Sequence, residues 1–243
     1  MSEPLPELDR QLLPRHVAII MDGNSRWARG RGLTRAHGHD AGGKSVRAIV
    51  EACRELGGIE AVSLYAFSTE NWRRSKTEVN TLFRLLSKYI HLEIEAIHKQ
   101  NIRVTWMGSA EGLPERAVND LRLCLERTAK NTAMTMNLAI NYGGRREIAD
   151  AARAIATEVK SGSLKLEAID EACVARHLYC PDLPDPDLLI RTSGEMRISN
   201  FMLWQLSYSE IVTVPTLWPD FRKPHLYAAL AEYQARSRRY GGR

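Results

Sequence analysis

Short apolar runs alternate with long helix-like stretches along almost the whole chain. The runs have the length of strands and cover residues 16–21, 61–67, 102–107, 134–140, 187–190 and 210–214. The helix-like stretches cover residues 41–56, 79–97, 114–130, 145–159, 166–176 and 224–240. No hairpin turn joins one run to the next, and strands that are connected through helices are typical of a parallel sheet. The sequence therefore predicts an α/β fold in which helices surround a central, mostly parallel sheet of about six strands.

One domain accounts for most of the chain. Its 243 residues, 44% of them hydrophobic, suit a single sizeable core. Residues 1–14 carry acidic residues and three prolines, and we expect a short N-terminal arm there, followed by one domain over residues 15–243. The first residues do not resemble a signal peptide, and no window approaches the ~18–20 apolar residues that span a bilayer. We therefore expect a cytoplasmic protein that is soluble or, at most, peripheral to the inner face of the membrane.

Charge and cysteine content leave the class of partner open. A formal net charge of +5 and a pI near 9.1 are compatible with an anionic substrate, a membrane surface or nucleic acid. The four cysteines form no CxxC pair and no zinc-like spacing, so we expect free thiols in a reducing compartment. They are Cys53, Cys124, Cys173 and Cys180.

The stretch over residues 79–97 carries one long apolar stripe. Its members recur with the 3.6-residue period of a helix, at Val79, Leu82, Phe83, Leu86, Tyr89, Ile90, Ile94 and Ile97. Packing against the core explains such a stripe, and one wall of an apolar tunnel would need the same pattern. The sequence leaves both interpretations open.

Polar segments follow four of the predicted strands. They are residues 22–27, 68–74, 141–145 and 191–199. In open α/β sheets, ligands bind outside the carboxyl ends of the strands. One such segment alone is a weak signal, but four of them at equivalent strand ends indicate a binding site.

Asp22 stands at the end of the first predicted strand, among basic side chains. Arg26, Arg29, Arg31 and Arg35 follow it closely. The planar guanidinium group suits the paired oxygens of a diphosphate. Mg²⁺ would explain a carboxylate in these surroundings, because this ion binds carboxylate and phosphate oxygens together. On this segment alone, a simple turn residue remains the alternative for Asp22.

A second possible anion site lies near the fifth predicted strand, at Arg191, Arg197 and Ser199. Glu210 comes at the start of the last predicted strand, where a charged side chain is unusual unless it is paired or bound to metal. Two separate arginine clusters would suit anionic groups on two substrates.

Several nucleotide and metal motifs are absent from the sequence. There is no GxxxxGK[ST] phosphate loop, no GxGxxG and no DDxxD. The acids between Asp182 and Asp187 are interrupted by prolines, which prevent a helix with acids on one face. This argues against the helical trans-prenyltransferases, which bind metal through paired aspartates.

Segments spread over residues 16–240 resemble the cis-prenyltransferase family, which includes the undecaprenyl diphosphate synthases. In chain order they read HVAIIMDGNSRWARGRGL, GHDAGGKSV, SLYAFSTENWRRS, MNLAINYGGR, DLLIRTSGEMRISNFMLWQLSYSEI and LWPDF. Ser25 and Ser193 stand where the family often has glycine. Trp106 is bulkier than the family's usual residue, and it would shorten the product if it pointed into the tunnel.

The resemblance implies roles for individual residues. Asp22 would be the catalytic aspartate and a Mg²⁺ ligand, with Glu210 as the second protein ligand of that ion. The diphosphate of the allylic substrate would be bound by Gly23, Asn24, Ser25 and Arg26, with Arg35 and Arg74 in support. The substrate site would be lined by Trp27, His39, Ser68, Thr69, Glu70 and Trp72. The diphosphate of isopentenyl diphosphate would be bound by Arg191, Arg197, Ile198 and Ser199.

Two further roles come from the resemblance. Asn71 matches the position assigned as proton acceptor in the family. A carboxamide is a poor base, so we expect Asn71 to orient the substrate or relay the proton to a diphosphate oxygen. Arg239 and Gly241 fit a C-terminal Arg-x-Gly element that reaches the active site of the other subunit in a homodimer. A basic, frayed tail is the alternative for this segment.

The reaction that the resemblance implies is head-to-tail condensation of isopentenyl diphosphate onto an allylic diphosphate, such as farnesyl or geranyl diphosphate. Repeated condensation would give a long-chain Z-polyprenyl diphosphate such as undecaprenyl diphosphate, a carrier lipid precursor for cell-wall polysaccharides. The growing chain would enter an apolar tunnel lined by the 79–97 helix, Ala66 and Leu138. Release of the product could involve peripheral contact with a membrane.

Two other classes of protein are disfavoured. Non-catalytic partner subunits of prenyltransferase pairs share the fold but lack the aspartate and arginines that this chain has. A nucleic-acid binder needs a positive face with aromatic residues placed for stacking. Here Asp22, Glu70 and Glu210 interrupt the basic segments, and we expect no nucleic-acid partner.

Overall fold

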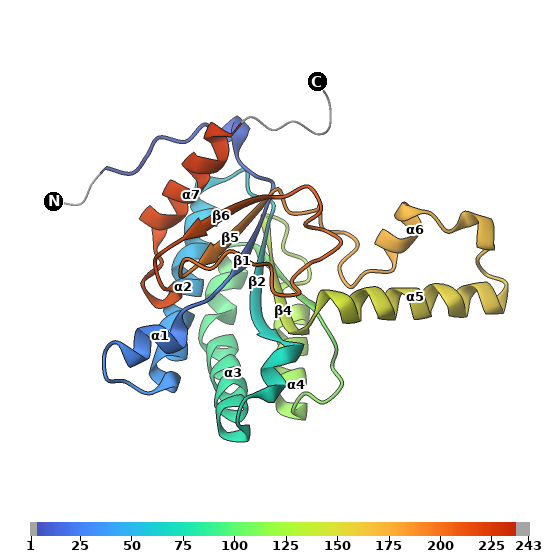
Figure 1. Ribbon diagram of the computed structural model, residues 1–243, viewed down its shortest axis with the longest axis horizontal. Coiled ribbons are helices and arrows are strands. Elements are labelled where there is room, and N and C mark those ends of the chain that lie inside the picture. The colour runs from blue at the N-terminus through green and yellow to red at the C-terminus, as the bar shows by residue number, and fades with distance from the viewer. Residues whose placement is uncertain (1–3, 237–243) are drawn as a thin grey trace.

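The computed structural model describes residues 4–236 and contains one six-stranded sheet (Figure 1). The spatial order of the strands is β3-β4-β2-β1-β5-β6, and every neighbouring pair is parallel. Their bounds are β1 His16–Ile20, β2 Ala61–Ser68, β3 Ile102–Met107, β4 Met134–Tyr142, β5 Leu188–Thr192 and β6 Glu210–Val214. The predicted α/β class and the six predicted strands are confirmed.

Seven α-helices connect and cover these strands in the described part of the chain. They are α1 Asn24–Arg29, α2 Arg35–Leu56, α3 Lys76–Lys99, α4 Glu115–Thr128, α5 Gly144–Ser161, α6 Glu171–Arg176 and α7 Lys223–Ala235. Four short 3-10 helices join them, η1 Arg10–Leu12, η2 Thr69–Arg73, η3 Leu166–Ala168 and η4 Trp218–Asp220.

The two faces of the sheet are covered differently. On one face, β-strand side chains form a large core with α2, α3, α4 and α7. On the other face, a smaller cluster packs Ala18, Ile20 and Leu189 against Phe201 and Met202, which lie in the segment after β5. All five residues of β1 and of β5 are buried. This explains why both strands are nearly continuous apolar runs rather than alternating ones.

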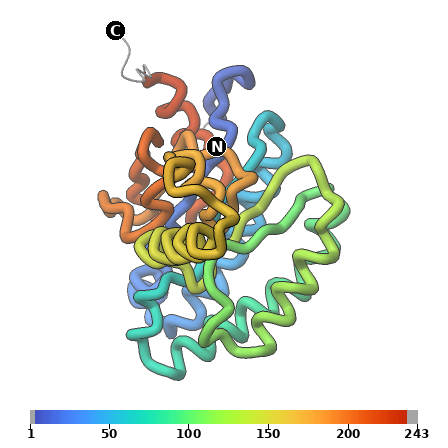
Figure 2. Tube along the Cα trace, turned by 90° about the vertical axis from the view of Figure 1, so that its right-hand side faces the viewer, coloured from blue at the N-terminus to red at the C-terminus, as the bar shows by residue number. Residues whose placement is uncertain are grey.

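Helix α5 extends away from the sheet, and the chain returns through η3 and α6 (Figures 1 and 2). We expected one helix over residues 166–176, but the chain forms two separate short helices there. The break has a local cause, because the carboxylate of Asp170 accepts a hydrogen bond from the backbone N–H of Cys173 at 2.7 Å and caps a new helix.

Helix α2 begins six residues earlier than the sequence pattern indicated. The missed turn contains Gly38, and a Cβ atom at this position would lie 2.2 Å from the carbonyl oxygen of Asn24. Glycine is a poor helix former, which concealed this turn, but its small size lets α1 lie directly against α2.

The first residues of the described chain are attached to the domain. Leu13 is buried in the large core. The side-chain amide of Gln234, on α7, donates to the backbone carbonyl of Asp9 at 2.7 Å and accepts from its N–H at 3.2 Å. Helix α7 was expected to reach residue 240, and residues 237–240 lie outside the described part of the chain.

Candidate active site

The polar segments that follow β1, β2, β4 and β5 meet at one edge of the sheet, where α1 begins (Figure 1). Hydrogen bonds link segments that are far apart in sequence. The guanidinium of Arg191 donates to Asp22 at 2.9 Å, and the N–H of Gly144 donates to the carbonyl of Asn200 at 2.7 Å. The parallel topology therefore brings the predicted polar residues together.

A cavity of about 730 Å³ opens at this edge and continues between the sheet and helices α2 and α3. Its polar lining includes nine of the predicted site residues, Asp22, Asn24, His39, Ser68, Glu70, Asn71, Arg74, Arg191 and Ser199. Deeper lining residues are mainly apolar and include the expected Ala66 and Leu138. The shape is that of a tunnel with a charged mouth and an apolar interior.

The apolar stripe on α3 both packs into the core and forms part of the cavity wall, the two interpretations that the sequence left open. Val79 and Ile94 belong to the buried core. Leu82, Leu86 and Ile97 line the cavity. Trp106 is not among the lining residues, and its indole N–H donates to the carbonyl of Ile140 at 3.0 Å. Its bulk therefore does not narrow the tunnel.

Asp22 is held between two arginines at the mouth. One carboxylate oxygen accepts from Arg191, and the other accepts from the N–H of Gly23 at 2.7 Å and lies 3.6 Å from Arg26. Burial favours the neutral form of this carboxyl, but the hydrogen bonds from Arg191 and Gly23 and the two positive charges outweigh it. The pKa of Asp22 is lowered below its ordinary value, so the group is anionic at neutral pH.

The turn after Asp22 requires glycine. Gly23 has φ of 108°, a conformation that side chains disfavour. A Cβ atom there would also lie 2.9 Å from the side chain of Leu217. This turn starts α1, which carries the predicted residues Asn24, Ser25, Arg26 and Trp27.

The two predicted arginine clusters are joined through Glu195. Its carboxylate lies 3.1 Å from Arg26 and also accepts from Arg197. Arg191 is almost fully buried and donates to the hydroxyl of Ser199 at 2.8 Å. Glu195 was not among the predicted site residues, although it lies within the segment between Arg191 and Ser199.

Two further carboxylates that hold predicted residues were missed. Glu78 binds both Arg35 and Arg74, at 2.8 Å and 3.1 Å. Asp220 accepts from the indole of Trp27 at 2.7 Å. Arg74 precedes α3 and Glu78 lies in its first turn, and their spacing of four residues was a signal available in the sequence.

The segment after β2 places Asn71 at the cavity and turns Trp72 away from it. The amide oxygen of Asn71 accepts the N–H of Ser68 at 3.1 Å. Trp72 donates its indole N–H to the side chain of Asn141 at 2.8 Å, and together with Thr69 it lines a second, smaller hollow. Of the predicted residues here, Ser68, Glu70 and Asn71 thus face the main cavity.

His39 lies in the wall of the cavity near the mouth. Its burial and the neighbouring charges of Arg74 and Arg35 lower its pKa to about 4. The imidazole is therefore neutral at neutral pH. Its Nε2 atom is buried and has no hydrogen-bond partner among the described residues.

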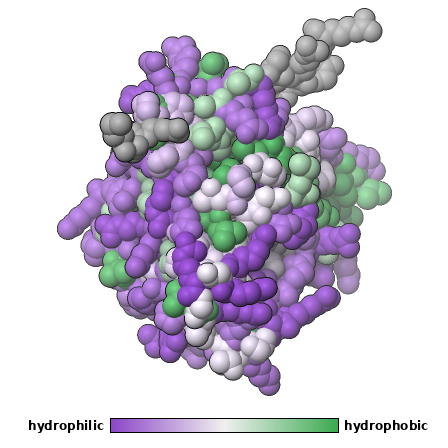
Figure 3. All heavy atoms as spheres, turned by 60° about the vertical axis from the view of Figure 1, so that its left-hand side comes forward, coloured by the Kyte–Doolittle hydropathy of each residue, from purple (hydrophilic) through white to green (hydrophobic). Residues whose placement is uncertain are grey.

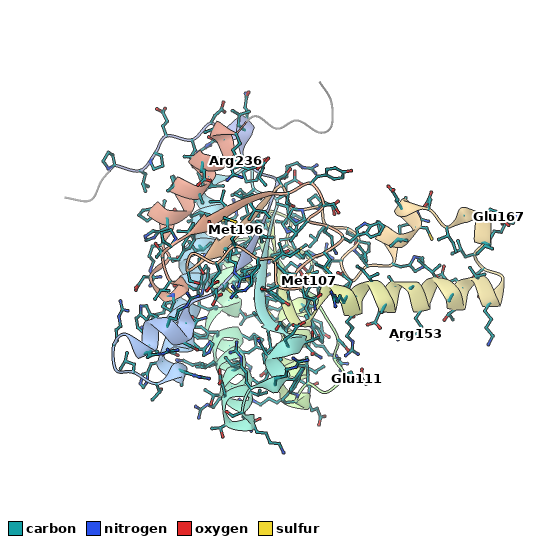
Figure 4. The ribbon with its side chains drawn as sticks, viewed as in Figure 1. Met107, Glu111, Arg153, Glu167, Met196 and Arg236 are labelled. Carbon is teal, nitrogen blue, oxygen red and sulfur yellow. The ribbon has the colours of Figure 1, made fainter. Side chains whose placement is uncertain are left out.

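The structure does not bring Glu210 to Asp22 within one chain. Glu210 is the first residue of β6 and is in register with Leu188, which is in register with Val17 on β1. Asp22 lies five residues beyond Val17, about 16 Å along the strand direction. Glu210 instead pairs at 2.7 Å with Arg236, labelled near the end of α7 in Figure 4. Within one chain the two carboxylates are therefore too far apart to hold one ion, and the role of Glu210 as second metal ligand stays a prediction.

The remaining predicted residues lie elsewhere. Ile198 packs against the smaller core cluster rather than in the cavity. Arg239 and Gly241 lie outside the described residues.

Among residues 4–236, no helix is long and apolar enough to cross a membrane. The face that lies on the left of Figure 1 is mostly hydrophilic, with hydrophobic residues in separate patches (Figure 3).

The mouth of the cavity contains a carboxylate, a type of oxygen ligand that Mg²⁺ binds. In the described part of the chain, no three His, Cys, Asp or Glu side chains gather as a complete metal site. Mg²⁺ commonly binds through one or two carboxylates, with substrate phosphates and waters as its other ligands. The carboxylate of Asp22, 31% exposed between two arginines that attract phosphate, fits this description.

Comparison with known proteins gives a consistent result. A family model described as putative undecaprenyl diphosphate synthase matches residues 20–241. An isoprenyl transferase of Halalkalibacterium halodurans is 49% identical over 241 residues, which cover 99% of this chain and 94% of the relative. A Thermobifida fusca protein, named as a trans,polycis-polyprenyl diphosphate synthase specific for (2Z,6E)-farnesyl diphosphate, is 49% identical over 237 residues and covers 98% and 84% of the two chains.

Solved structures show the same architecture. Lavandulyl diphosphate synthase from Lavandula x intermedia, in complex with dimethylallyl diphosphate, matches with a TM-score of 0.92 and 39% identity over 95% of this chain and 99% of that one. A probable undecaprenyl diphosphate synthase from Campylobacter jejuni matches with a TM-score of 0.77 and 34% identity over 94% and 98%.

Proposed function

Because this chain belongs to the undecaprenyl diphosphate synthase family of cis-prenyltransferases, we propose that it condenses isopentenyl diphosphate head-to-tail onto an allylic diphosphate. Farnesyl or geranyl diphosphate would start the chain. Repeated condensation would give a long-chain Z-polyprenyl diphosphate, with undecaprenyl diphosphate as the proposed product.

The cavity is the observation that carries this proposal. Anionic and cationic groups surround its mouth, and apolar side chains line its interior. This is the complement of a molecule with a diphosphate at one end and a hydrocarbon chain at the other. A water-soluble metabolite without a hydrocarbon chain would leave most of the interior unused.

The arginines supply most of the proposed electrostatic catalysis. Arg26 would bind the diphosphate of the allylic substrate, and Arg191 and Arg197 that of isopentenyl diphosphate. When the allylic C–O bond breaks, negative charge develops on the departing diphosphate, and fixed cations at this position stabilise that charge. Asp22 keeps Arg191 oriented through its 2.9 Å hydrogen bond.

We propose Mg²⁺ as the cofactor and Asp22 as its ligand. The ion would neutralise charge on the diphosphate as a Lewis acid. Because Glu210 is remote from Asp22 in one chain, it is not part of this proposed ion site within a single subunit.

Loss of a proton completes each condensation. The amide oxygen of Asn71 already accepts the N–H of Ser68, which fixes the orientation of the side chain. Asn71 is therefore proposed to position the substrate, with a diphosphate oxygen as the final proton acceptor. The neutral imidazole of His39 lies nearby in the cavity wall.

Several wider proposals accompany this activity. The product would be the carrier lipid precursor for cell-wall polysaccharides, made in the cytoplasm and released with peripheral contact at the membrane. The active form would be a homodimer, to which Arg239 and Gly241 of the C-terminal segment would contribute. Sedimentation at several concentrations tests the dimer.

One assay tests the function. The purified protein is incubated with farnesyl or geranyl diphosphate, labelled isopentenyl diphosphate and Mg²⁺, and the products are separated by length. We expect a ladder of polyprenyl diphosphates and loss of activity after exhaustive treatment with EDTA. The absence of labelled product with every allylic starter would contradict the proposal, and full activity in EDTA would contradict the role of the metal.

A further inference from the structure

Helices α2 and α3 form the outer wall of the cavity, and they are fixed to each other at two levels. Toward the mouth, Gly43 lies against Tyr89 so closely that a Cβ atom would be 2.2 Å from the ring. Toward the inner end of the cavity, which we call its floor, the side chain of Arg54 donates to the carbonyl of Gln100 at 3.0 Å. The wall between these two levels contains charged residues.

These residues are Arg47 and Glu51 on α2 and Glu93 on α3, and we call them the wall cluster. All three line the otherwise mainly apolar interior. The guanidinium of Arg47 lies 2.9 Å from Glu51 and 3.6 Å from Glu93. One arginine thus pairs with two glutamates, so the formal charge of the cluster is negative.

Glu93 differs from the other two members of the wall cluster in its exposure. The side chains of Arg47 and Glu51 are 54% and 36% exposed, so both reach solvent although they also line the cavity. The side chain of Glu93 is only 14% exposed, and its ion pair with Arg47 is long. Glu93 therefore depends on the remaining water for part of its solvation.

The cluster lies partway along the tunnel. Helix α3 runs from the mouth toward the floor and rises ~1.5 Å per residue. Glu93 is therefore about 16 Å below Leu82 and about 10 Å above Gln100, which also line the cavity. A hydrocarbon chain that grows inward meets the cluster before it reaches the floor.

We propose that the wall cluster limits the length of the product, by making further extension of the hydrocarbon chain past Glu93 unfavourable. This inference rests on the proposed prenyl transfer. A chain that packs against Glu93 removes water from a carboxylate that is only partly compensated by Arg47. Removing water from an incompletely paired charge is costly, whereas packing against apolar wall residues is favourable.

The test replaces the carboxylate and measures product length. We expect Glu93→Leu, and to a smaller extent Glu93→Gln, to shift the main product upward by at least one five-carbon unit. Arg47→Met leaves both glutamates without their cation, and we expect it to shift the product downward. Glu95→Leu is the matched control, because Glu95 is on the same helix and pairs with Arg127 but does not line the cavity.

A binding experiment separates this inference from the proposed function. Saturated alkyl diphosphates of increasing length are titrated into each protein without isopentenyl diphosphate. Affinity should rise about fourfold per added methylene until the chain reaches the cluster and then level off. In Glu93→Leu the rise should continue over additional methylenes, and in Glu95→Leu it should level off at the wild-type length.

The outcomes are distinct. If the wild type makes no prenyl product, the proposed function fails, whereas the binding profile still tests the cluster. If the wild type is active but Glu93→Leu and Glu93→Gln leave both product length and the levelling point unchanged, the inference is overturned. Equal shifts in Glu93→Leu and Glu95→Leu would also overturn it, because they would indicate a general loosening of α3.

Discussion

The arginines at the mouth are held in place by carboxylates of the same chain. Asp22 and Glu195 hold Arg26, and Asp22 also holds Arg191. Side chains that are already oriented lose less conformational freedom when a diphosphate binds. The arginines can be predicted from their density in the sequence, but the role of Glu195 cannot, because it depends on the folding of the segment after β5.

Replacing the central carboxylate tests the proposed catalytic site. Asp22→Asn keeps the size of the side chain but removes its charge, and we expect turnover to fall at least ~100-fold, as when a key electrostatic group is lost. The measurement is the single-turnover rate with labelled isopentenyl diphosphate, alongside the thermal midpoint as a check on folding. A folded variant with near-normal turnover would refute the role of Asp22.

A buried histidine on β1 predicts sensitivity to acid. The neutral ring of His16 donates from Nδ1 to the carbonyl of Pro184 at 2.6 Å, and Nε2 accepts from the hydroxyl of Ser63 at 2.8 Å. Burial lowers the pKa of His16 from 6.5 to about 4. Between these pH values the unfolded chain binds a proton that the folded chain excludes, so the free energy of unfolding falls as the pH falls.

The expected loss from this residue is about 3 kcal/mol between pH 6.5 and 4, at 1.36 kcal/mol per pKa unit. Urea unfolding at pH 7 and at pH 5 measures the first part of this loss, about 2 kcal/mol. His16→Gln should be less stable than the wild type at pH 7 but should lose less stability on acidification. Equal losses in both proteins would show that His16 is not a source of the acid sensitivity.

At the scale of elements, the sequence predicts helix bounds least well where a contact with another segment determines where the helix begins. The apolar pattern located α3 and α4 because their stripes face a core. The beginning of α2 was not predicted because Gly38 is there to admit Asn24 of α1, and this contact is not visible in a local pattern. Close approach of two elements thus places glycine where helix propensity alone would not.

The crossing of α2 and α3 can be tested at its closest point. Gly43→Ala places a methyl group against the ring of Tyr89, and we expect a loss of ~1–3 kcal/mol in the free energy of unfolding. Chemical denaturation of Gly43→Ala, Tyr89→Ala and the double variant measures the coupling. The double variant should be destabilised by less than the sum of the single changes, and strict additivity would contradict the proposed contact.

At the scale of the molecule, chain order and topology decided which sequence predictions succeeded. Strands joined through helices could be recognised as a parallel sheet, and a parallel sheet gathers the segments after its strands at one edge. The same rule separates Glu210 from Asp22, because Glu210 begins its strand and Asp22 follows one. Residues at opposite ends of parallel strands in one chain lie on opposite edges of the sheet, so strand position already separates these two carboxylates within a subunit.

The tunnel between sheet and helices predicts how product length responds to bulk. Ala66 lines the cavity at an irregularity in the β2–β4 pairing, close to the mouth residue Ser68. Ala66→Leu should obstruct the hydrocarbon path there and shorten the product, while the first condensation continues. Product sizing measures this, with Ala156→Leu on the exposed side of α5 as the control.

Because the obstruction lies nearer the mouth than Glu93, the double variant Ala66→Leu, Glu93→Leu should make products as short as those of Ala66→Leu alone. Products as long as those of Glu93→Leu would show that the chain follows another path.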